Sequence, residues 1–252
     1  MKLEDRFDIE PPIHVGQIAT SYPARQKGLA RRVLLKVIHP QWTRDRELVE
    51  RFNREGKAIA LIDHPNVVRV FEYGEADGVY YLAFEWIDGG TLADRIKEGP
   101  LEQGQVRRIA AGVLAGLDAV HRAGLVHRDL KPDNIMVDCD GNPRLTDFSL
   151  AGFRHLPGLT GHGSIVGSPA YMAPEVVDGD PATPRSDLWA LGIVLLESIT
   201  GSNPYKADDP MLSLERVRRN APPHLSERGN ICLLYTSPSP RDLSTSRMPS
   251  SA

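Results

Sequence analysis

The nine-residue segment Val126–Asn134 constrains this chain more than any other part of its sequence. It reads Val-His-Arg-Asp-Leu-Lys-Pro-Asp-Asn, with a carboxylate at Asp129, an ammonium group at Lys131 and an amide at Asn134. Another carboxylate, Asp147, follows thirteen residues after the amide. A carboxylate base, a cation and oxygen ligands for magnesium are the groups that phosphoryl transfer to a hydroxyl requires. We therefore expect a fold in which these four side chains converge.

The segment resembles the catalytic loop of protein kinases, and Asp147-Phe148-Ser149 resembles their DFG segment with its glycine replaced. The resemblance is to eukaryotic-like, bacterial-type serine/threonine kinases, because Lys131 stands where tyrosine-specific relatives differ. It implies that Asp129 is the catalytic base and that Lys131 holds the transferring phosphoryl group. Asn134 and Asp147 would bind Mg²⁺ beside ATP. In the alternative interpretation, the same carboxylate and amide groups only cap a turn.

The same resemblance implies ATP-binding residues in the first third of the chain. Lys36 and Glu55 would form the ion pair that positions the α- and β-phosphates. Gly16 belongs to the segment that matches the glycine-rich loop, and Glu85 and Trp86 are further cofactor-binding candidates. Taken alone, a lysine or a glutamate is more often a solvated surface charge.

Later motifs concern substrate binding and regulation. The run Gly167–Glu175 matches the substrate-docking segment that ends in Ala-Pro-Glu, and Asp187 matches the aspartate that fixes the catalytic-loop backbone in the family. Arg128, beside the expected base, suggests a switch in which a loop phosphate pairs with its guanidinium. The candidate hydroxyls are Thr160, Ser164 and Ser168, although a serine or threonine there could also be an ordinary loop residue.

The apolar pattern predicts an α+β fold, and its order matches the bilobal kinase fold. A small strand-rich N-lobe with one helix is expected over residues 7–87, and a mostly helical C-lobe over 88–231. The expected N-lobe elements are a buried strand at 33–38, a helix at 44–62 and a strand pair at 67–73 and 79–86. In the C-lobe, an apolar stripe runs along residues 106–120, and an almost wholly apolar helix at 188–199 is followed by a C-cap glycine, Gly201.

The last residues, 232–252, differ in composition from the rest and are rich in serine, proline, arginine and threonine. One interpretation is a disordered linker. We prefer another, because codons for Cys232–Ser237 and Pro238–Asp242 can be chosen that look like a sequencing-library transposon end and its adapter. On this interpretation the segment is not native protein and is left out of the fold prediction. The native chain would then be truncated at its C-terminus, before the final helices of the fold.

Charge and composition give no support for several classes of partner and location. The net charge of −3 gives no electrostatic case for binding nucleic acid or a membrane surface, and no apolar run approaches the ~20 residues of a membrane span. Two cysteines, Cys139 and Cys232, cannot form a disulfide framework, so we expect a cytoplasmic protein. The expected partners are ATP, a protein substrate and, for autophosphorylation, a second copy of the chain.

The nucleotide-binding pattern is incomplete. The glycine-rich loop pattern falls on His14, Gly16, Ala19 and Ser21, so one glycine of three is kept. Leu34 replaces an alanine expected beside the adenine, and Ser149 replaces the DFG glycine. We expect an active kinase with weakened ATP binding, because every charged catalytic position is present. The alternative is a pseudokinase, a scaffold module with weak or no ATP turnover.

Overall fold

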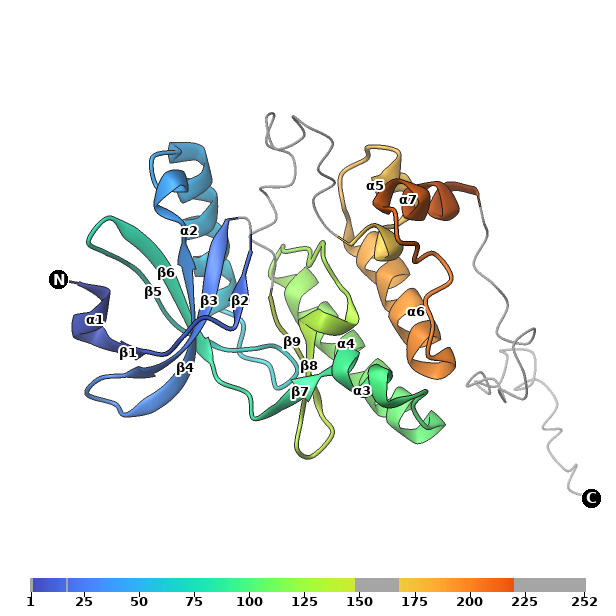
Figure 1. The fold of residues 1–252 in the computed structure, drawn as a ribbon, viewed down its shortest axis with the longest axis horizontal. Coiled ribbons are helices and arrows are strands. Elements are labelled where there is room, and N and C mark those ends of the chain that lie inside the picture. Colours follow the sequence, from blue (N-terminus) through green and yellow to red (C-terminus); the bar gives the residue numbers. More distant parts are fainter. Residues whose placement is uncertain (1, 17, 148–167, 220–252) are drawn as a thin grey trace, which may run out of the picture. The chain divides into compact units, whose positions relative to one another are not determined.

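The computed structural model describes residues 2–16, 18–147 and 168–219. Strands dominate the first part of the chain and helices the second (Figure 1). The strands are β1 (Phe7–Ile9), β2 (His14–Val15), β3 (Ala19–Gln26), β4 (Arg31–Ile38), β5 (Val70–Ala76), β6 (Val79–Glu85), β7 (Gly89–Thr91), β8 (Ile135–Asp138) and β9 (Pro143–Leu145). The helices are α1 (Leu3–Arg6), α2 (Arg46–Ala60), α3 (Leu92–Glu98), α4 (Gln103–Arg122), α5 (Pro174–Val177), α6 (Pro184–Thr200) and α7 (Pro210–Arg219). The α+β order predicted from the sequence is confirmed.

The first sheet is antiparallel and has the strand order β1-β3-β4-β6-β5, with β2 paired to β3. Its register places Ser21 of β3 opposite both His14 of β2 and Lys36 of β4. Leu34 of β4 is opposite Phe84 of β6. The strand predicted around Lys36 is confirmed, and the register gathers the expected nucleotide-binding positions on neighbouring strands.

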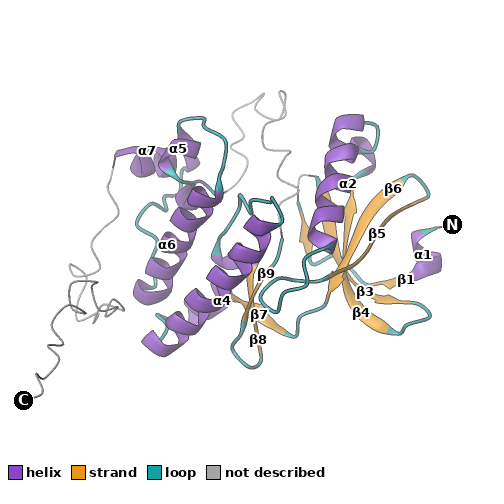
Figure 2. Cartoon of the chain, turned by 180° about the vertical axis from the view of Figure 1, so that it is seen from behind, coloured by secondary structure: helices purple, strands orange, loops and turns teal. Residues whose placement is uncertain are grey.

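Helix α2 packs beside β5 on one side of this sheet (Figure 2). It begins just after Asp45, whose carboxylate accepts a hydrogen bond from the Leu48 N–H (3.1 Å). Such an N-cap satisfies a backbone donor that has no partner within the helix. Phe52 and Ile59 are buried on the inner face. The helix predicted at 44–62 is therefore confirmed, with slightly shorter bounds.

Helices form most of the second part. The predicted stripe is confirmed in α4, where its members are at most 2% exposed: Val106, Ile109, Val113, Leu117 and Val120. Helix α6 ends at Gly201, whose φ of 73° is the left-handed C-cap conformation that favours glycine. Within the described ranges, no helix is both long and apolar enough to cross a lipid bilayer.

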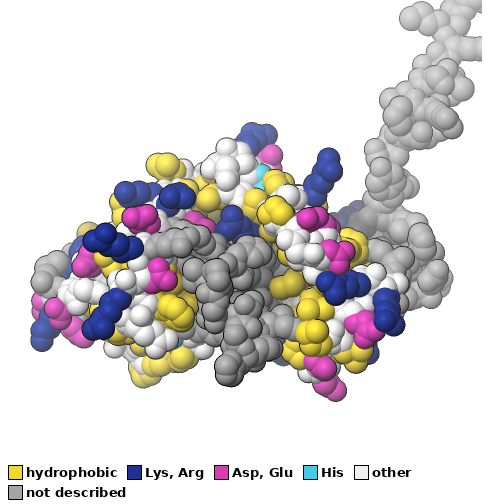
Figure 3. Space-filling model, turned by 90° about the horizontal axis from the view of Figure 1, so that it is seen from above, with side chains coloured by type: hydrophobic (Ala, Val, Ile, Leu, Met, Phe, Trp, Pro, Cys, Tyr) yellow, Lys and Arg dark blue, Asp and Glu magenta, His cyan; other side chains and the backbone are white. Residues whose placement is uncertain are grey.

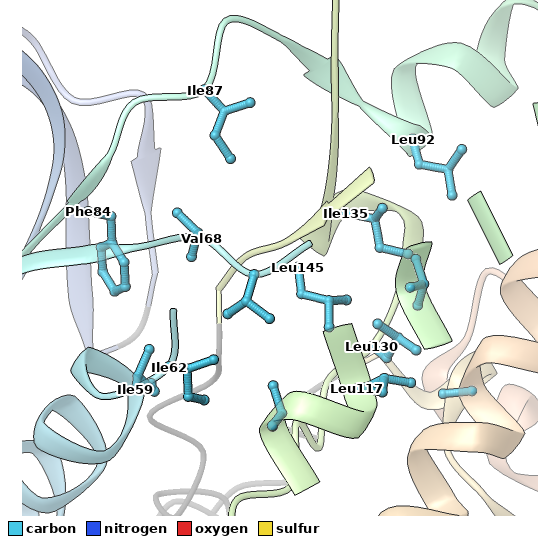
Figure 4. Packing of buried hydrophobic residues seen from close by; sticks show 14 of the residues in the cluster. Ile59, Ile62, Val68, Phe84, Ile87, Leu92, Leu117, Leu130, Ile135 and Leu145 are labelled. Atoms are coloured by element: carbon cyan, nitrogen blue, oxygen red, sulfur yellow. The ribbon is translucent and has the colours of Figure 1, made fainter. Parts of the chain in front are cut away.

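Residues 66–68 connect the first sheet to the second, which has the order β7-β8-β9. The Leu145 N–H donates to the Asn66 carbonyl (2.8 Å), and the Val68 N–H donates to the Leu145 carbonyl (2.9 Å). Figure 4 shows Val68 and Leu145 among the packed side chains of the main core cluster. Because residues 66–68 are engaged here, β5 begins later than the sequence predicts.

Candidate active site

The segment Val126–Asn134 lies between α4 and β8 and closes in a 3₁₀ turn at Pro132–Asn134. The Asn134 Nδ2 donates to the Asp129 carbonyl (2.7 Å) and lies 3.3 Å from the Asp129 Oδ2. The Lys131 Nζ lies 3.7 Å from the same Oδ2. The expected base, cation and amide therefore share one hydrogen-bonded turn. Since the Asn134 nitrogen faces this turn, its amide oxygen is the atom that can bind a cation.

Asp187 on α6 holds the backbone of this segment. Its Oδ1 accepts from the Arg128 N–H and its Oδ2 from the His127 N–H, both at 2.9 Å. The Oδ2 also lies 2.8 Å from the His121 Nε2. Asp187 is only 2% exposed, so the carboxylate depends on these donors for its stability. The role expected for Asp187 is confirmed.

His127 connects the segment to the residues that precede Asp147. Its side chain is fully buried, and its Nε2 lies 3.1 Å from the Thr146 carbonyl. The Thr146 N–H in turn donates to the Asn134 carbonyl (3.0 Å). Burial lowers the pKa of His127, which favours the neutral imidazole at physiological pH. The sequence analysis did not select this residue.

Asp147 reaches Lys36 of β4 and forms an ion pair with it, although 111 positions separate the two residues. Desolvation in the cleft acts to raise the pKa of Asp147, but the Lys36 ammonium opposes it, and the net effect is a lowered pKa. The carboxylate is therefore ionised at neutral pH and is a hard oxygen donor of the kind that Mg²⁺ prefers. With the Asn134 amide oxygen, it makes a donor set that fits a magnesium ion.

Among the described residues, both members of the expected Lys36–Glu55 ion pair have other partners. Lys36 pairs with Asp147, while the Arg128 Nη1 lies 3.4 Å from the Glu55 Oε1. Arg128 reaches Glu55 from a backbone with a φ of 67°. Lys36 and Glu55 each pair with an opposite charge that the fold brings close from a distant part of the chain. Spacing in the sequence does not predict which of the possible partners that will be. Arg128, expected as a phosphate-binding switch residue, already pairs with a carboxylate.

A cleft of about 510 Å³ lies between the first sheet and the catalytic segment. Its volume is within the range of small-molecule sites. The predicted residues that line it are Lys36, Glu85, Trp86, Lys131, Asn134 and Asp147, and the family departures His14, Ser21 and Leu34 also line it. Gly16 is not among them: it lies in the turn between β2 and β3, where its N–H donates to the Ala19 carbonyl (3.0 Å).

The expected regulatory hydroxyl Ser168 lies beside the catalytic turn. Its Oγ accepts a hydrogen bond from the Lys131 Nζ (3.1 Å). Ser168 and Asp129 line a small hollow of about 20 Å³ that adjoins the turn. The Ser168 hydroxyl therefore lies next to the expected base. Thr160 and Ser164, like Ser149, lie outside the described residues.

Thr91 and Asp94 also line the cleft, and the sequence analysis did not select them. They form a capping box at the start of α3: the Asp94 N–H donates to the Thr91 Oγ1 (3.1 Å), and the Thr91 N–H donates to the Asp94 Oδ2 (3.2 Å). The hydrogen bond from the Thr91 hydroxyl, followed by that from Lys97, lowers the pKa of Asp94 to about 2. The Thr-x-x-Asp spacing after two glycines could have located this pair.

Known proteins resemble this chain over most of its length. At 36% identity over 225 residues, it is similar to the probable serine/threonine-protein kinase pknA2 of Bifidobacterium longum, with 87% of this chain and 30% of that protein covered. It is 34% identical over 223 residues to the serine/threonine-protein kinase PrkC of Bacillus subtilis (88% and 34% covered). Identity to the serine/threonine-protein kinase PknL of Mycobacterium tuberculosis is 35% over 222 residues (87% and 56% covered).

The chain therefore spans between about a third and just over half of the length of these relatives. The sequence pattern described as "Protein kinase domain" matches residues 7–242. This match extends past residue 232, so the interpretation of the tail as translated adapter stays a prediction. The match covers far more than half of the residues. The chain belongs to the protein kinase domain family.

Proposed function

We propose that this domain transfers the γ-phosphoryl group of ATP to a serine or threonine hydroxyl of a protein. One observation carries the proposal: Asp129, Lys131 and Asn134 share one turn, and Asp147 lines the same cleft as Lys131 and Asn134. The named relatives give no support to the pseudokinase alternative, for which the altered cleft residues His14, Ser21 and Leu34 remain the argument. The relatives that the chain resembles are named serine/threonine kinases, which supports this substrate class.

In the proposed reaction, the Asp129 carboxylate accepts the proton of the attacking hydroxyl. The new oxygen–phosphorus bond forms as the bond from the γ-phosphorus to the bridging oxygen of ADP breaks. The Lys131 ammonium holds the γ-phosphoryl oxygens. Asn134 and Asp147 would hold Mg²⁺, which neutralises phosphate charge when bound.

The other end of the cleft would take the nucleoside. Glu85 and Trp86 lie where the chain leaves β6, and they line the cleft together with Leu34 and Ser21. Lys36 would approach the α- and β-phosphates after exchanging its partner Asp147 for the nucleotide. ATP bound in this way would contact both the first sheet and the catalytic turn.

The protein substrate would bind beside Ser168 and Asp129, and a second copy of the chain would serve as substrate in autophosphorylation. On the face shown in Figure 3, positive and negative side chains are interspersed over the coloured surface. Such a surface suits protein partners better than a polyanion. The low cysteine count supports activity in the cytoplasm.

The test compares the full-length protein with its Asp129→Asn variant in an autophosphorylation assay with labelled ATP and Mg²⁺. We expect the variant to lose roughly 10²- to 10⁴-fold in rate, because it lacks the base. Asp118→Asn is the matched control, since this carboxylate lies on the exposed side of α4 in an ion pair with Arg122, and its rate should equal wild type. Equal phosphorylation by wild type and Asp129→Asn would overturn the proposed function.

A further inference from the structure

The chain crosses from the first sheet to the second through residues 85–88, here called the crossing segment. Its first residue, Glu85, ends β6 and lines the cleft. The Glu85 carboxylate accepts hydrogen bonds from Arg144 of β9: the Arg144 Nη1 lies 2.9 Å from both Oε1 and Oε2. A side chain of the second sheet therefore forms an ion pair with Glu85, the last residue of β6.

Backbone hydrogen bonds run alongside this ion pair. The Glu85 N–H donates to the Arg69 carbonyl (2.8 Å), and the Val68 N–H donates to the Leu145 carbonyl (2.9 Å). Residues 66–69 thus connect the end of β6 to β9 through backbone hydrogen bonds. The Glu85–Arg144 ion pair connects the same two strands through side chains. The two connections together tie the start of the crossing segment to β9.

The pair is shielded from solvent more than ordinary surface pairs are. The side chains of Arg144 and Glu85 are 27% and 30% exposed. Within the part of the chain that the structure describes, the Arg144 Nε is buried and makes no hydrogen bond. Glu85 therefore supplies much of the compensation for placing this guanidinium at the junction, and partly buried pairs are screened less by salt than exposed ones.

The neighbouring residue, Trp86, is contacted by an arginine of the first sheet. The Arg32 guanidinium, from β4, lies 4.0 Å from the centre of the Trp86 ring. Trp86 also donates from its Nε1 to the Asp88 Oδ1 (3.0 Å). Two successive residues of the crossing segment, both in the cleft lining, are thus each contacted by an arginine, one from each sheet.

We propose that Arg144 is a positioning residue for the nucleotide: it holds the crossing segment in place, and so sets the affinity of the cleft for ATP. Arg144 is not among the residues that line the cleft, so it acts through Glu85. The inference rests on the proposed kinase function for its nucleotide readout. The arrangement of the segment itself does not depend on turnover.

The experiment uses the full-length protein and the variants Arg144→Gln, Arg144→Lys, Glu85→Gln and the double variant Glu85→Gln/Arg144→Gln. We expect Arg144→Gln to raise the KM for ATP by roughly 3- to 10-fold, the size of one partly shielded ion pair, with kcat changed less than about twofold. Arg144→Lys keeps the charge and should recover most of the affinity. The double variant should lose no more than the worse single variant, because both act on one contact.

Hydrogen exchange provides a readout that needs no nucleotide. In Arg144→Gln, the amides of residues 84–88 should exchange faster than in wild type, while those of α6 should not change. Arg122→Gln is the matched control, because its ion pair with Asp118 is exposed on α4, and it should leave both readouts unchanged. If Arg144→Gln matches wild type in KM and in exchange while Asp129→Asn loses activity, the positioning role is wrong and the kinase proposal stands. If wild type neither binds nor uses ATP but exchange at 84–88 still accelerates in Arg144→Gln, the kinase proposal fails and the positioning of the segment stands.

Discussion

Two residues of the site have left-handed backbone without being glycine. Arg128 has a φ of 67° and Asp147 a φ of 52°. Such a conformation costs about 1–2 kcal/mol for a residue with a Cβ, so other contacts must hold it. Asp187 accepts from the Arg128 N–H, and Lys36 pairs with Asp147. The site geometry therefore depends on partners distant in sequence rather than on local preference.

His127 should make the stability of the domain depend on pH. Burial lowers its pKa in the folded state, whereas the unfolded chain takes up a proton near pH ~6.5. Below that pH the unfolded state binds more protons than the folded state. The free energy of unfolding should therefore fall as the pH drops below ~6.5, by up to about 1.4 kcal/mol per pH unit from this residue, and the contribution ends at the folded pKa.

The measurement is urea unfolding of wild type and His127→Gln at a series of pH values between 5 and 7.5. The chain has eight histidines, so the informative quantity is the difference between the two slopes. We expect a shallower slope in the variant. Parallel slopes would show that the folded state accepts the proton at His127 as readily as the unfolded chain does.

At the scale of elements, the contact of α4 with β9 depends on a residue without a side chain. A Cβ on Gly116 would lie 2.7 Å from the Asn66 carbonyl oxygen and 2.9 Å from the Leu145 Cδ1. The backbone oxygen cannot move without disturbing the connection between the sheets, because Asn66 accepts from the Leu145 N–H. The helix can therefore approach this closely only with glycine at that position.

We expect Gly116→Val to lower the free energy of unfolding by about 1–3 kcal/mol, the usual cost of overfilling a packed interior. Gly104→Val is the matched control in the same helix, since nothing lies within 4 Å of a Cβ there. Its effect should stay within about 0.5 kcal/mol. Equal destabilisation of the two variants in urea unfolding would mean that helix propensity, and not the contact with Asn66, decides the outcome.

Elements with strong periodicity were the predictable part of the fold. The stripe from Val106 to Val120 has a helical period, and the Gly201 C-cap follows an apolar run, so local pattern alone places α4 and the end of α6. The start of β5 was placed too early, because residues 67 and 68 have strand-like sequence yet bond to Leu145. Only a contact between distant segments decides that boundary.

The part of the site that lies within one short segment could be predicted from the sequence. Asp129, Lys131 and Asn134 lie within one turn of chain, so their convergence follows from sequence. The partners of Lys36 and Glu55 did not follow from the sequence, because the fold brings Asp147 and Arg128 from distant segments next to them. Arg144 was missed for a related reason: nothing in its surroundings in sequence points to Glu85, 59 positions away.

At the scale of the whole molecule, the cleft joins two parts with separate sheets. Leu34 and Lys36 come from the first sheet, while Lys131 and Asn134 come from the turn before β8. A nucleotide that contacts both parts binds the folded state and not the unfolded chain. ATP with Mg²⁺ should therefore raise the free energy of unfolding, by about 2.7 kcal/mol at a concentration 100 times the dissociation constant.

Leu34 limits that gain, because its side chain lines the cleft opposite Phe84 in the register. We expect Leu34→Ala to bind ATP more tightly, roughly 5- to 150-fold if the extra side chain costs ~1–3 kcal/mol against the bound nucleotide. The free protein should be less stable, since the variant removes a partly buried side chain from the sheet. The two effects have opposite signs, so a thermal shift measured with and without ATP and Mg²⁺ separates them. Leu61→Ala is the matched control, because Leu61 is 85% exposed at the end of α2 and should leave both quantities unchanged. An unchanged ATP-dependent shift in Leu34→Ala would mean that this strand does not contact the bound nucleotide at residue 34.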